Sequence, residues 1–151
     1  MKSVEKLIEE QVGKWRLSQS GKAPAAPQPI PVVTISREPG SGGRLIGERV
    51  AARLGFDLYY QEVLHEMARS ANVSERLVST LDERGLNLLE EWIASLVDSR
   101  HLWPDQYMKH LMNVVGTIGR HGRAVLIGRG ANFLLPPEQR LSVRVIAPFE
   151  F

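Results

Sequence analysis

The sequence predicts a three-layer α/β domain in which helices cover both faces of a parallel sheet. Short β-branched segments alternate with longer segments of helical periodicity, and a glycine-rich turn links the first clear strand to a helix. The chain has 151 residues, of which 43% are hydrophobic and 24% are charged. This size and composition are typical of one soluble globular domain.

Composition excludes several classes of function. The chain has no cysteine, so it forms no disulfide, thiolate metal site or cysteine nucleophile, and its four histidines lack the spacing of metal ligands. A net charge of +2 is too small to indicate a nucleic-acid partner. No apolar run approaches the roughly 20 residues of a membrane-spanning helix, and the N-terminus lacks the apolar core of a secretory signal. We therefore expect a soluble cytoplasmic protein that binds neither nucleic acid nor a membrane.

An N-terminal helical arm is predicted for residues 1–17. Apolar residues recur there at helical spacing: Val4, Leu7, Ile8, Val12 and Trp15. Such a stripe packs on its own domain or on a second subunit, so the sequence allows a homodimer. Residues 18–31 include four prolines in eight positions, which predicts an extended linker.

The main domain is predicted to cover residues 32–151. A β-branched run predicts its first strand at 32–36, and apolar periodicity predicts a helix over 45–54. Gly55 is placed to end that helix, and residues 57–60 could form a second short strand.

A helical insert is predicted between residues 61 and 121. It contains four amphipathic stripes, with Ser74 as the expected cap of the second and Pro104 as the break before the fourth. Two further strands are predicted at 124–127 and 142–147.

The glycine-rich turn is the most informative segment. Its central residues are Gly40, Ser41, Gly42 and Gly43. A glycine turn between a strand and a helix leaves backbone N–H groups free, and the helix dipole adds partial positive charge. Together these features favour a phosphate site, because no β-carbon blocks the approach of the anion. The alternative is a tight turn with only a structural role.

Neither strict phosphate-binding motif is present. The dinucleotide pattern fails because Leu45 stands where its third glycine belongs. In the Walker pattern, Arg37 takes the place of the first glycine and Gly43 that of the lysine. Leu45 also replaces the hydroxyl residue that usually holds magnesium.

Two separated segments resemble the cytidylate kinase-like family. They read Val33-Thr34-Ile35-Ser36-Arg37-Glu38, continued by Gly40-Ser41-Gly42-Gly43-Arg44 and Ile46-Gly47, and Val125-Leu126-Ile127-Gly128-Arg129-Gly130-Ala131-Asn132. The resemblance covers about residues 32–148. It implies a P-loop kinase fold and ATP-dependent phosphorylation of a nucleoside monophosphate, CMP by the family's name, with Mg²⁺ bound to the ATP.

The resemblance also implies roles for the donor site. Gly40, Ser41, Gly42 and Gly43 would wrap the ATP phosphates. Arg44, at the start of the following helix, would replace the missing lysine charge, with Arg37 as the second candidate for that catalytic role.

The acceptor site follows from the same resemblance. Arg129 would grip the acceptor phosphate, within a Gly-Arg-Gly segment that stands where cytidylate kinases carry Gly-Arg-Asp. Glu62 would substitute for a charged residue that follows Tyr-Asp in the family, where this chain has Tyr60-Gln61. The insert at 61–121 corresponds in position to the monophosphate-binding insert.

Three hypotheses about the function are compatible with the sequence. Nucleotide kinases close an arginine-bearing lid that follows the third clear strand, and the sequence stops there, which suggests truncation or loss of the lid. The leading hypothesis is a CMP kinase. A nucleotide-binding or regulatory module without catalysis is favoured by the missing lysine, hydroxyl and lid. A kinase for a non-nucleotide acceptor is favoured by Gln61 and Gly130.

Overall fold

A computed structural model of the chain describes residues 4–20, 31–99 and 105–148. Their sheet is entirely parallel, with the strand order β2-β3-β1-β4. The four strands are β1 (Val32–Arg37), β2 (Asp57–Tyr59), β3 (Ala124–Ile127) and β4 (Arg140–Val145). The predicted α/β class and parallel sheet are confirmed.

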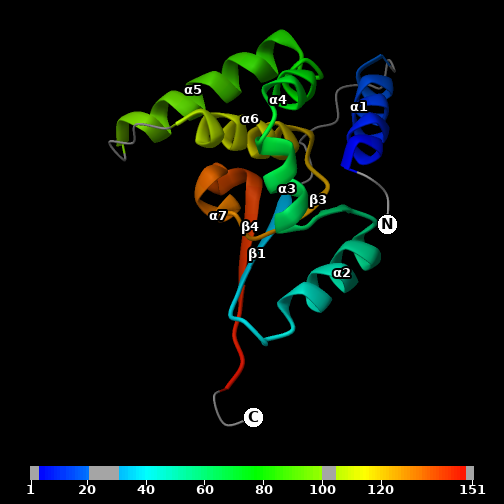
Figure 1. The fold of residues 1–151 in the computed structure, drawn as a ribbon, viewed down its shortest axis with the longest axis vertical. Coiled ribbons are helices and arrows are strands. Elements are labelled where there is room, and N and C mark those ends of the chain that lie inside the picture. Colours follow the sequence, from blue (N-terminus) through cyan, green and yellow to red (C-terminus); the bar gives the residue numbers. More distant parts are fainter. Residues whose placement is uncertain (1–3, 21–30, 100–104, 149–151) are drawn as a thin grey trace.

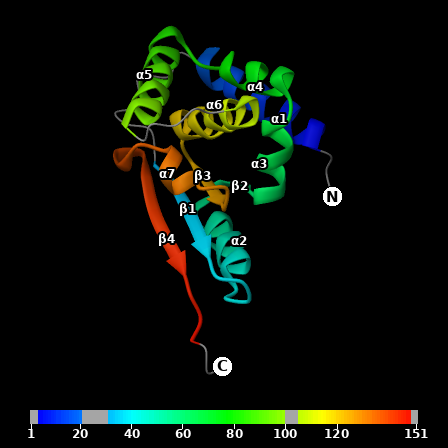
Figure 2. The same cartoon turned by 60° about the vertical axis from the view of Figure 1, so that its left-hand side comes forward.

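Helices cover both faces of this sheet (Figures 1 and 2). They are α1 (Val4–Ser20), α2 (Gly43–Leu54), α3 (Gln61–Ala68), α4 (Ala71–Val78), α5 (Glu83–Ser99), α6 (Gln106–His121) and α7 (Ala131–Leu134). Helix α2 packs on one face, whereas α6, α7, α3, α4 and α1 form a larger core on the other. The predicted three-layer arrangement is therefore present, with α3 to α6 forming the helical region between β2 and β3.

Strand β1 lies in the middle of the sheet and separates the two cores. Its alternate side chains face opposite layers: Val33 and Ile35 pack with α2, and Val32 packs with the larger helical layer. Because all four strands are parallel, their carboxyl ends lie at one edge of the sheet. The glycine-rich turn and the segment after β3 both leave the sheet at this edge, which is where ligands bind in open α/β sheets.

Helix α2 lies close to the sheet because of a glycine. A β-carbon added to Gly47 would lie 2.7 Å from Ile127 Cδ1, so a larger residue here would have to displace that side chain. At the other end of α2, Gly55 has φ 67° and its N–H bonds to Ala51 O. The predicted stop at Gly55 is confirmed.

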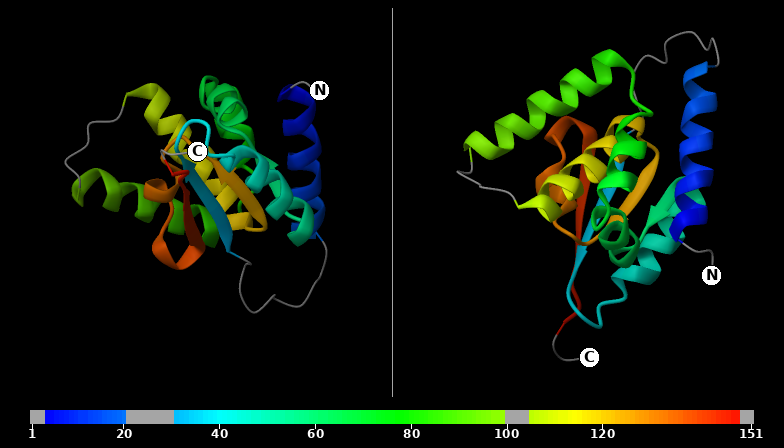
Figure 3. Two further views of the ribbon diagram at one scale, coloured as in Figure 1. Left: turned by 90° about the horizontal axis from the view of Figure 1, so that it is seen from below. Right: turned by 45° about the horizontal axis from the view of Figure 1, so that its top comes forward.

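Helix α1 packs on its own domain through the predicted apolar stripe (Figure 3). Ile8, Val12 and Trp15 are buried, and the Trp15 ring stacks on His121 with centroids 4.0 Å apart. The helix continues to Ser20, three residues past the predicted end, because residues 18–20 contain no helix breaker. Of the predicted linker, 21–30 lie outside the described residues.

Two local predictions are wrong in detail. The side chain of Ser70, not Ser74, caps α4 and accepts a hydrogen bond from Val73 N at 3.3 Å, whereas Ser74 is buried within the helix. The last strand begins at Arg140 and ends at Val145, two residues earlier than predicted, because its register with β1 pairs Arg140 with Val32. Within the described ranges, no helix is both long and apolar enough to span a membrane.

Candidate functional site

The glycine-rich turn begins directly after β1 and leads into α2. Ser41 N donates to Glu38 O at 3.1 Å, which closes the turn, and Ile46 N donates to Gly42 O at 3.0 Å, which starts the helix. Gly40 and Gly42 have φ values of 77° and 83°, in the left-handed region that favours glycine. The N–H groups of the first turn of α2 have no intrahelical acceptor, so they are available to an anion beside the turn.

A second turn of unusual backbone conformation follows β3. Gly128, Arg129 and Gly130 have φ values of 82°, 56° and 67°, so three successive residues lie in the left-handed region. Gly128 N donates to Ile35 O at 3.0 Å, which fixes this turn beside the end of β1. The two segments that the sequence predicted as signatures thus meet at the carboxyl edge of the sheet.

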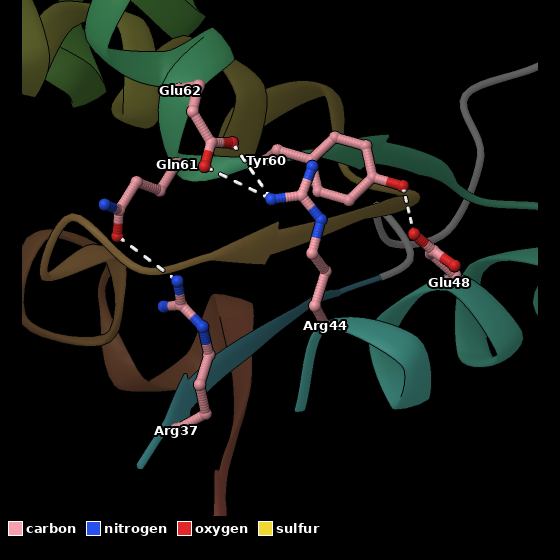
Figure 4. A network of polar contacts seen from close by, with 6 residues as sticks. All are labelled: Arg37, Arg44, Glu48, Tyr60, Gln61 and Glu62. Carbon is pink, nitrogen blue, oxygen red and sulfur yellow. Dashed lines mark hydrogen bonds and ion pairs between the residues drawn. The ribbon is translucent and has the colours of Figure 1, made fainter. Parts of the chain in front are cut away.

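Arg37 lies against Gly43 of the first turn and Gly128 of the second. Figure 4 shows its guanidinium pointing toward Gln61. Its aliphatic stem packs across Gly43, where an added β-carbon would lie 2.5 Å from Arg37 Cβ. Its Nη1 would lie 3.0 Å from a β-carbon on Gly128, and its Nη2 donates to Gln61 Oε1 at 3.4 Å. Among the described residues no carboxylate forms an ion pair with Arg37, although its charge helps to lower the pKa of the Glu62 carboxyl nearby.

Arg44 has different surroundings (Figure 4). Its Nη1 lies 3.2 Å from Glu62 Oε1, and its guanidinium lies 4.0 Å from the centroid of the Tyr60 ring. The Tyr60 hydroxyl in turn donates to Glu48 Oε1 at 2.6 Å. These contacts join α2 to the start of α3. They also pair Arg44, the first candidate to replace the missing lysine at the ATP phosphates, with the Glu62 carboxylate.

The protonation states at this junction follow from the same contacts. The hydrogen bond to Glu48 raises the pKa of the Tyr60 hydroxyl above its ordinary value. A hydrogen bond from its own backbone N–H and the nearby Arg44 guanidinium lower the pKa of the Glu62 carboxyl. At neutral pH Glu62 is therefore ionised and Tyr60 is neutral, so Arg44 faces a full negative charge.

Within the described ranges, two polar atoms at this edge are buried without a hydrogen-bond partner. They are Ser41 Oγ, in the first turn, and Arg129 Nε, in the second. A buried donor without an acceptor costs about 1–3 kcal/mol, which calls for an explanation in each case. Both atoms can donate to phosphate oxygens, so the residues present fit a bound phosphate group.

The described residues include no group of three or more His, Cys, Asp or Glu side chains that could hold a metal ion. Leu45, at the position of the usual hydroxyl ligand, is 55% exposed. A magnesium ion at this edge would take its ligands mainly from nucleotide phosphates and water, as this ion commonly does.

Sequence reasoning missed three residues of this site. In the sequence Gln61 is only a residue that differs from the family pattern, whereas in the structure it contacts Arg37 and lies against Gly128. Tyr60 and Glu48 were not singled out. The four-residue offset of Arg44 and Glu48 on one helix was a usable signal, since it places both on one face.

The parallel sheet, with a glycine turn and a helix N-terminus at its carboxyl edge, defines an α/β domain consistent with the P-loop kinase-like fold. The model of the Cytidylate kinase-like family matches residues 32–151. The chain belongs to this family.

A crystal structure of an uncharacterized protein from Eubacterium ventriosum ATCC 27560 is similar over 79% of this chain, with 19% sequence identity and a TM-score of 0.48. The chain spans 55% of that protein's length. No match was found among curated proteins.

Proposed function

We propose that this protein transfers the γ-phosphoryl group of MgATP to a nucleoside monophosphate, with CMP as the first candidate acceptor. One observation carries the proposal: Arg37, whose charge is unpaired, lies between the glycine turn before α2 and the turn around Arg129. Phosphoryl transfer depends mainly on positioning and on neutralising charge on the transferred group. A donor turn and an acceptor turn with a cation between them supply both.

The donor side would be formed by the turn of Gly40, Ser41, Gly42 and Gly43, whose N–H groups and Ser41 hydroxyl would contact the ATP phosphates. Arg37 would contact the phosphoryl group in transfer, because its charge is not committed to a carboxylate. Bound Mg²⁺ would neutralise charge on the β- and γ-phosphate oxygens.

The acceptor side would be formed by Arg129, whose unpartnered Nε would donate to the monophosphate. An oxygen of that phosphate would form a bond to the γ-phosphorus as the bond to the bridging oxygen of ADP breaks. No general base is needed because the acceptor phosphate is already ionised. Arg44 and Glu62 would act by holding α3 against α2, and Arg44 would reach a phosphate only by releasing Glu62.

A second function is favoured by a specific observation. Leu45 places an exposed apolar side chain where a magnesium-binding hydroxyl is usual, and the Arg44 charge is engaged by Glu62. Both features suit a module that binds a nucleotide without transferring its phosphate.

The test is ADP formation from MgATP with CMP, UMP, AMP and GMP, using this chain and the open reading frame that contains it. We expect CMP to stimulate ADP formation, and Arg129→Met to remove that stimulation without loss of ATP binding. Arg123→Met is a matched control, because Arg123 also has a left-handed backbone (φ 55°) but lies before β3, at the opposite edge of the sheet.

The outcomes separate the three readings. ATP binding without stimulation by any monophosphate contradicts the kinase proposal and supports the binding module. A basal ATPase that only a non-nucleotide phosphate ester stimulates supports a different acceptor. Equal effects of the two arginine variants would show that Arg129 has no special role.

A further inference from the structure

A cavity of about 270 Å³ lies between α5, α6 and the segment before β4, outside the site described above. Its lining includes Leu89, Glu91 and Trp92 from α5, Gly116 and Arg120 from α6, and Glu138 from the segment before β4. Figure 2 shows α5 running beside α6 on the helical side of the sheet. None of these residues takes part in the proposed phosphoryl transfer.

The position of the cavity makes it a separate site. Arg120 is in the last turn of α6, just before β3, and Glu138 just precedes β4. Both therefore lie at the amino ends of the strands, whereas the glycine turns lie at the carboxyl ends. Strand β4 has six residues, so the two edges are about 20 Å apart.

The walls of the cavity are fixed by packing. Leu89 lies directly against Gly116, where no side chain could be added without displacing it. The Trp92 indole donates from Nε1 to Leu134 O at 2.7 Å. This hydrogen bond anchors the indole ring, which forms part of the cavity lining.

Arg120 supplies an unsatisfied donor. Its Nε is buried and has no hydrogen-bond partner among the described residues. No ion pair links its guanidinium to Glu91 or Glu138 in the part of the chain that the structure describes, although all three line the same cavity. The cavity thus combines the Arg120 guanidinium, the Ser95 hydroxyl and the Gln139 amide, which can all donate hydrogen bonds, with two exposed carboxylates that can accept them.

This combination selects a class of ligand. Two carboxylates against one guanidinium disfavour a phosphate or carboxylate ligand. They suit an uncharged group that has a carbonyl acceptor for Arg120 and amino N–H donors for the glutamates. The Trp92 ring adds an aromatic surface for a planar group. We propose that this cavity is a second ligand site, which binds the base of an uncharged nucleoside.

The experiment records the indole N–H signals of the chain by ¹⁵N NMR during titration with cytidine and, separately, with adenosine. Trp92→Phe assigns the relevant signal among the three tryptophans. We expect a saturable shift of the Trp92 signal, and a loss of affinity of about ten-fold in Arg120→Met, as for one hydrogen bond in a desolvated site. Arg123→Met, three residues along the chain and outside the cavity, should bind like the wild type.

A second variant keeps the proposal falsifiable if Arg120→Met fails to fold. Ser95→Trp adds bulk at an exposed position in the cavity lining and should abolish the shift. Saturating ATP should leave the nucleoside-induced shift of the Trp92 signal unchanged, because the cavity and the glycine turns lie at opposite edges of the sheet. The proposal is overturned if neither nucleoside moves the Trp92 signal at millimolar concentration, which would leave the cavity to water. Displacement by ATP, or indifference to both variants, would also overturn it.

Discussion

Arg37 Nη2 lies 3.4 Å from Gln61 Oε1, across the ends of β1 and β2. The partner is a neutral amide, so the arginine is oriented without being neutralised. Arg44, seven residues later, has a carboxylate partner in Glu62 at 3.2 Å. We therefore expect Arg37 to contact the phosphates and Arg44 to hold α3 against α2, a difference that the sequence alone does not show.

Replacing Gln61 by glutamate should weaken MgATP binding by about ten-fold, because the new carboxylate would pair with Arg37 and compensate its charge. Gln61→Met removes the hydrogen bond without adding charge and should keep affinity within about three-fold of the wild type. Isothermal titration with MgATP measures both. Equal affinities in all three proteins would show that Arg37 does not contact the phosphates.

Arg37→Met should reduce ATP affinity by at least about ten-fold, whereas Arg44→Met should change it by less than about three-fold. The reason is that the Arg44 charge is already compensated by Glu62. The pair is exposed, so its loss should cost less than about 1 kcal/mol of the free energy of unfolding. The reverse order of affinities would make Arg44 the replacement for the missing lysine.

Gly128→Ala should destabilise the fold by about 1–3 kcal/mol, since it combines a left-handed backbone with steric overlap. An added β-carbon would lie 2.8 Å from Gln61 Oε1. Gly55→Ala is the control, because Gly55 also has a positive φ but has open space around the added carbon. Urea unfolding compares them. If both variants lose the same stability, the close contact with Gln61 has no effect.

Stability should fall on acidification because of His121. Burial of the ring, followed by the charge of Arg120, lowers the pKa of His121 from 6.5 to about 4. Between pH 6.5 and 4 the unfolded chain binds a proton that the folded protein excludes, so the free energy of unfolding decreases as the pH falls. The loss from this residue should be about 3 kcal/mol. In His121→Phe, which retains the stack on Trp15 but cannot titrate, thermal unfolding should show a flatter dependence over the same window.

Tyr59→Phe should raise the free energy of unfolding by up to about 1 kcal/mol. The Tyr59 side chain is 5% exposed and its hydroxyl has no hydrogen-bond partner among the described residues. Removing the hydroxyl leaves the packing of the ring intact and removes an unsatisfied polar group. A loss of stability in chemical denaturation would mean that the hydroxyl has a partner in solution.

The strand, turn and helix over residues 32–54 could be predicted because their signals are local. The β-branched run, the glycines and the stop at Gly55 each act within a few residues. The sequence does not identify the cap of α4 because Ser70 and Ser74 each stand three residues before an apolar residue, Val73 or Leu77. The structure distinguishes them, since Ser70 accepts the cap hydrogen bond and Ser74 is packed in the core.

The partners within the candidate site could not be predicted in the same way. Arg44 and Glu62 are 18 residues apart, and Arg37 and Gln61 are 24 apart. Each pairing depends on how α3 leaves the sheet relative to α2, which is set by tertiary packing. The sequence could identify the two glycine turns and the arginines in them, but not which arginine keeps its charge free.

The most direct test of the central claim is ³¹P NMR of the chain, and of the open reading frame that contains it, with MgATP and CMP. We predict that CDP and ADP appear together in equal amounts, and that Arg37→Met abolishes both products while the fold is retained. Bound ATP that yields no diphosphate from CMP or from any other monophosphate would contradict the claim.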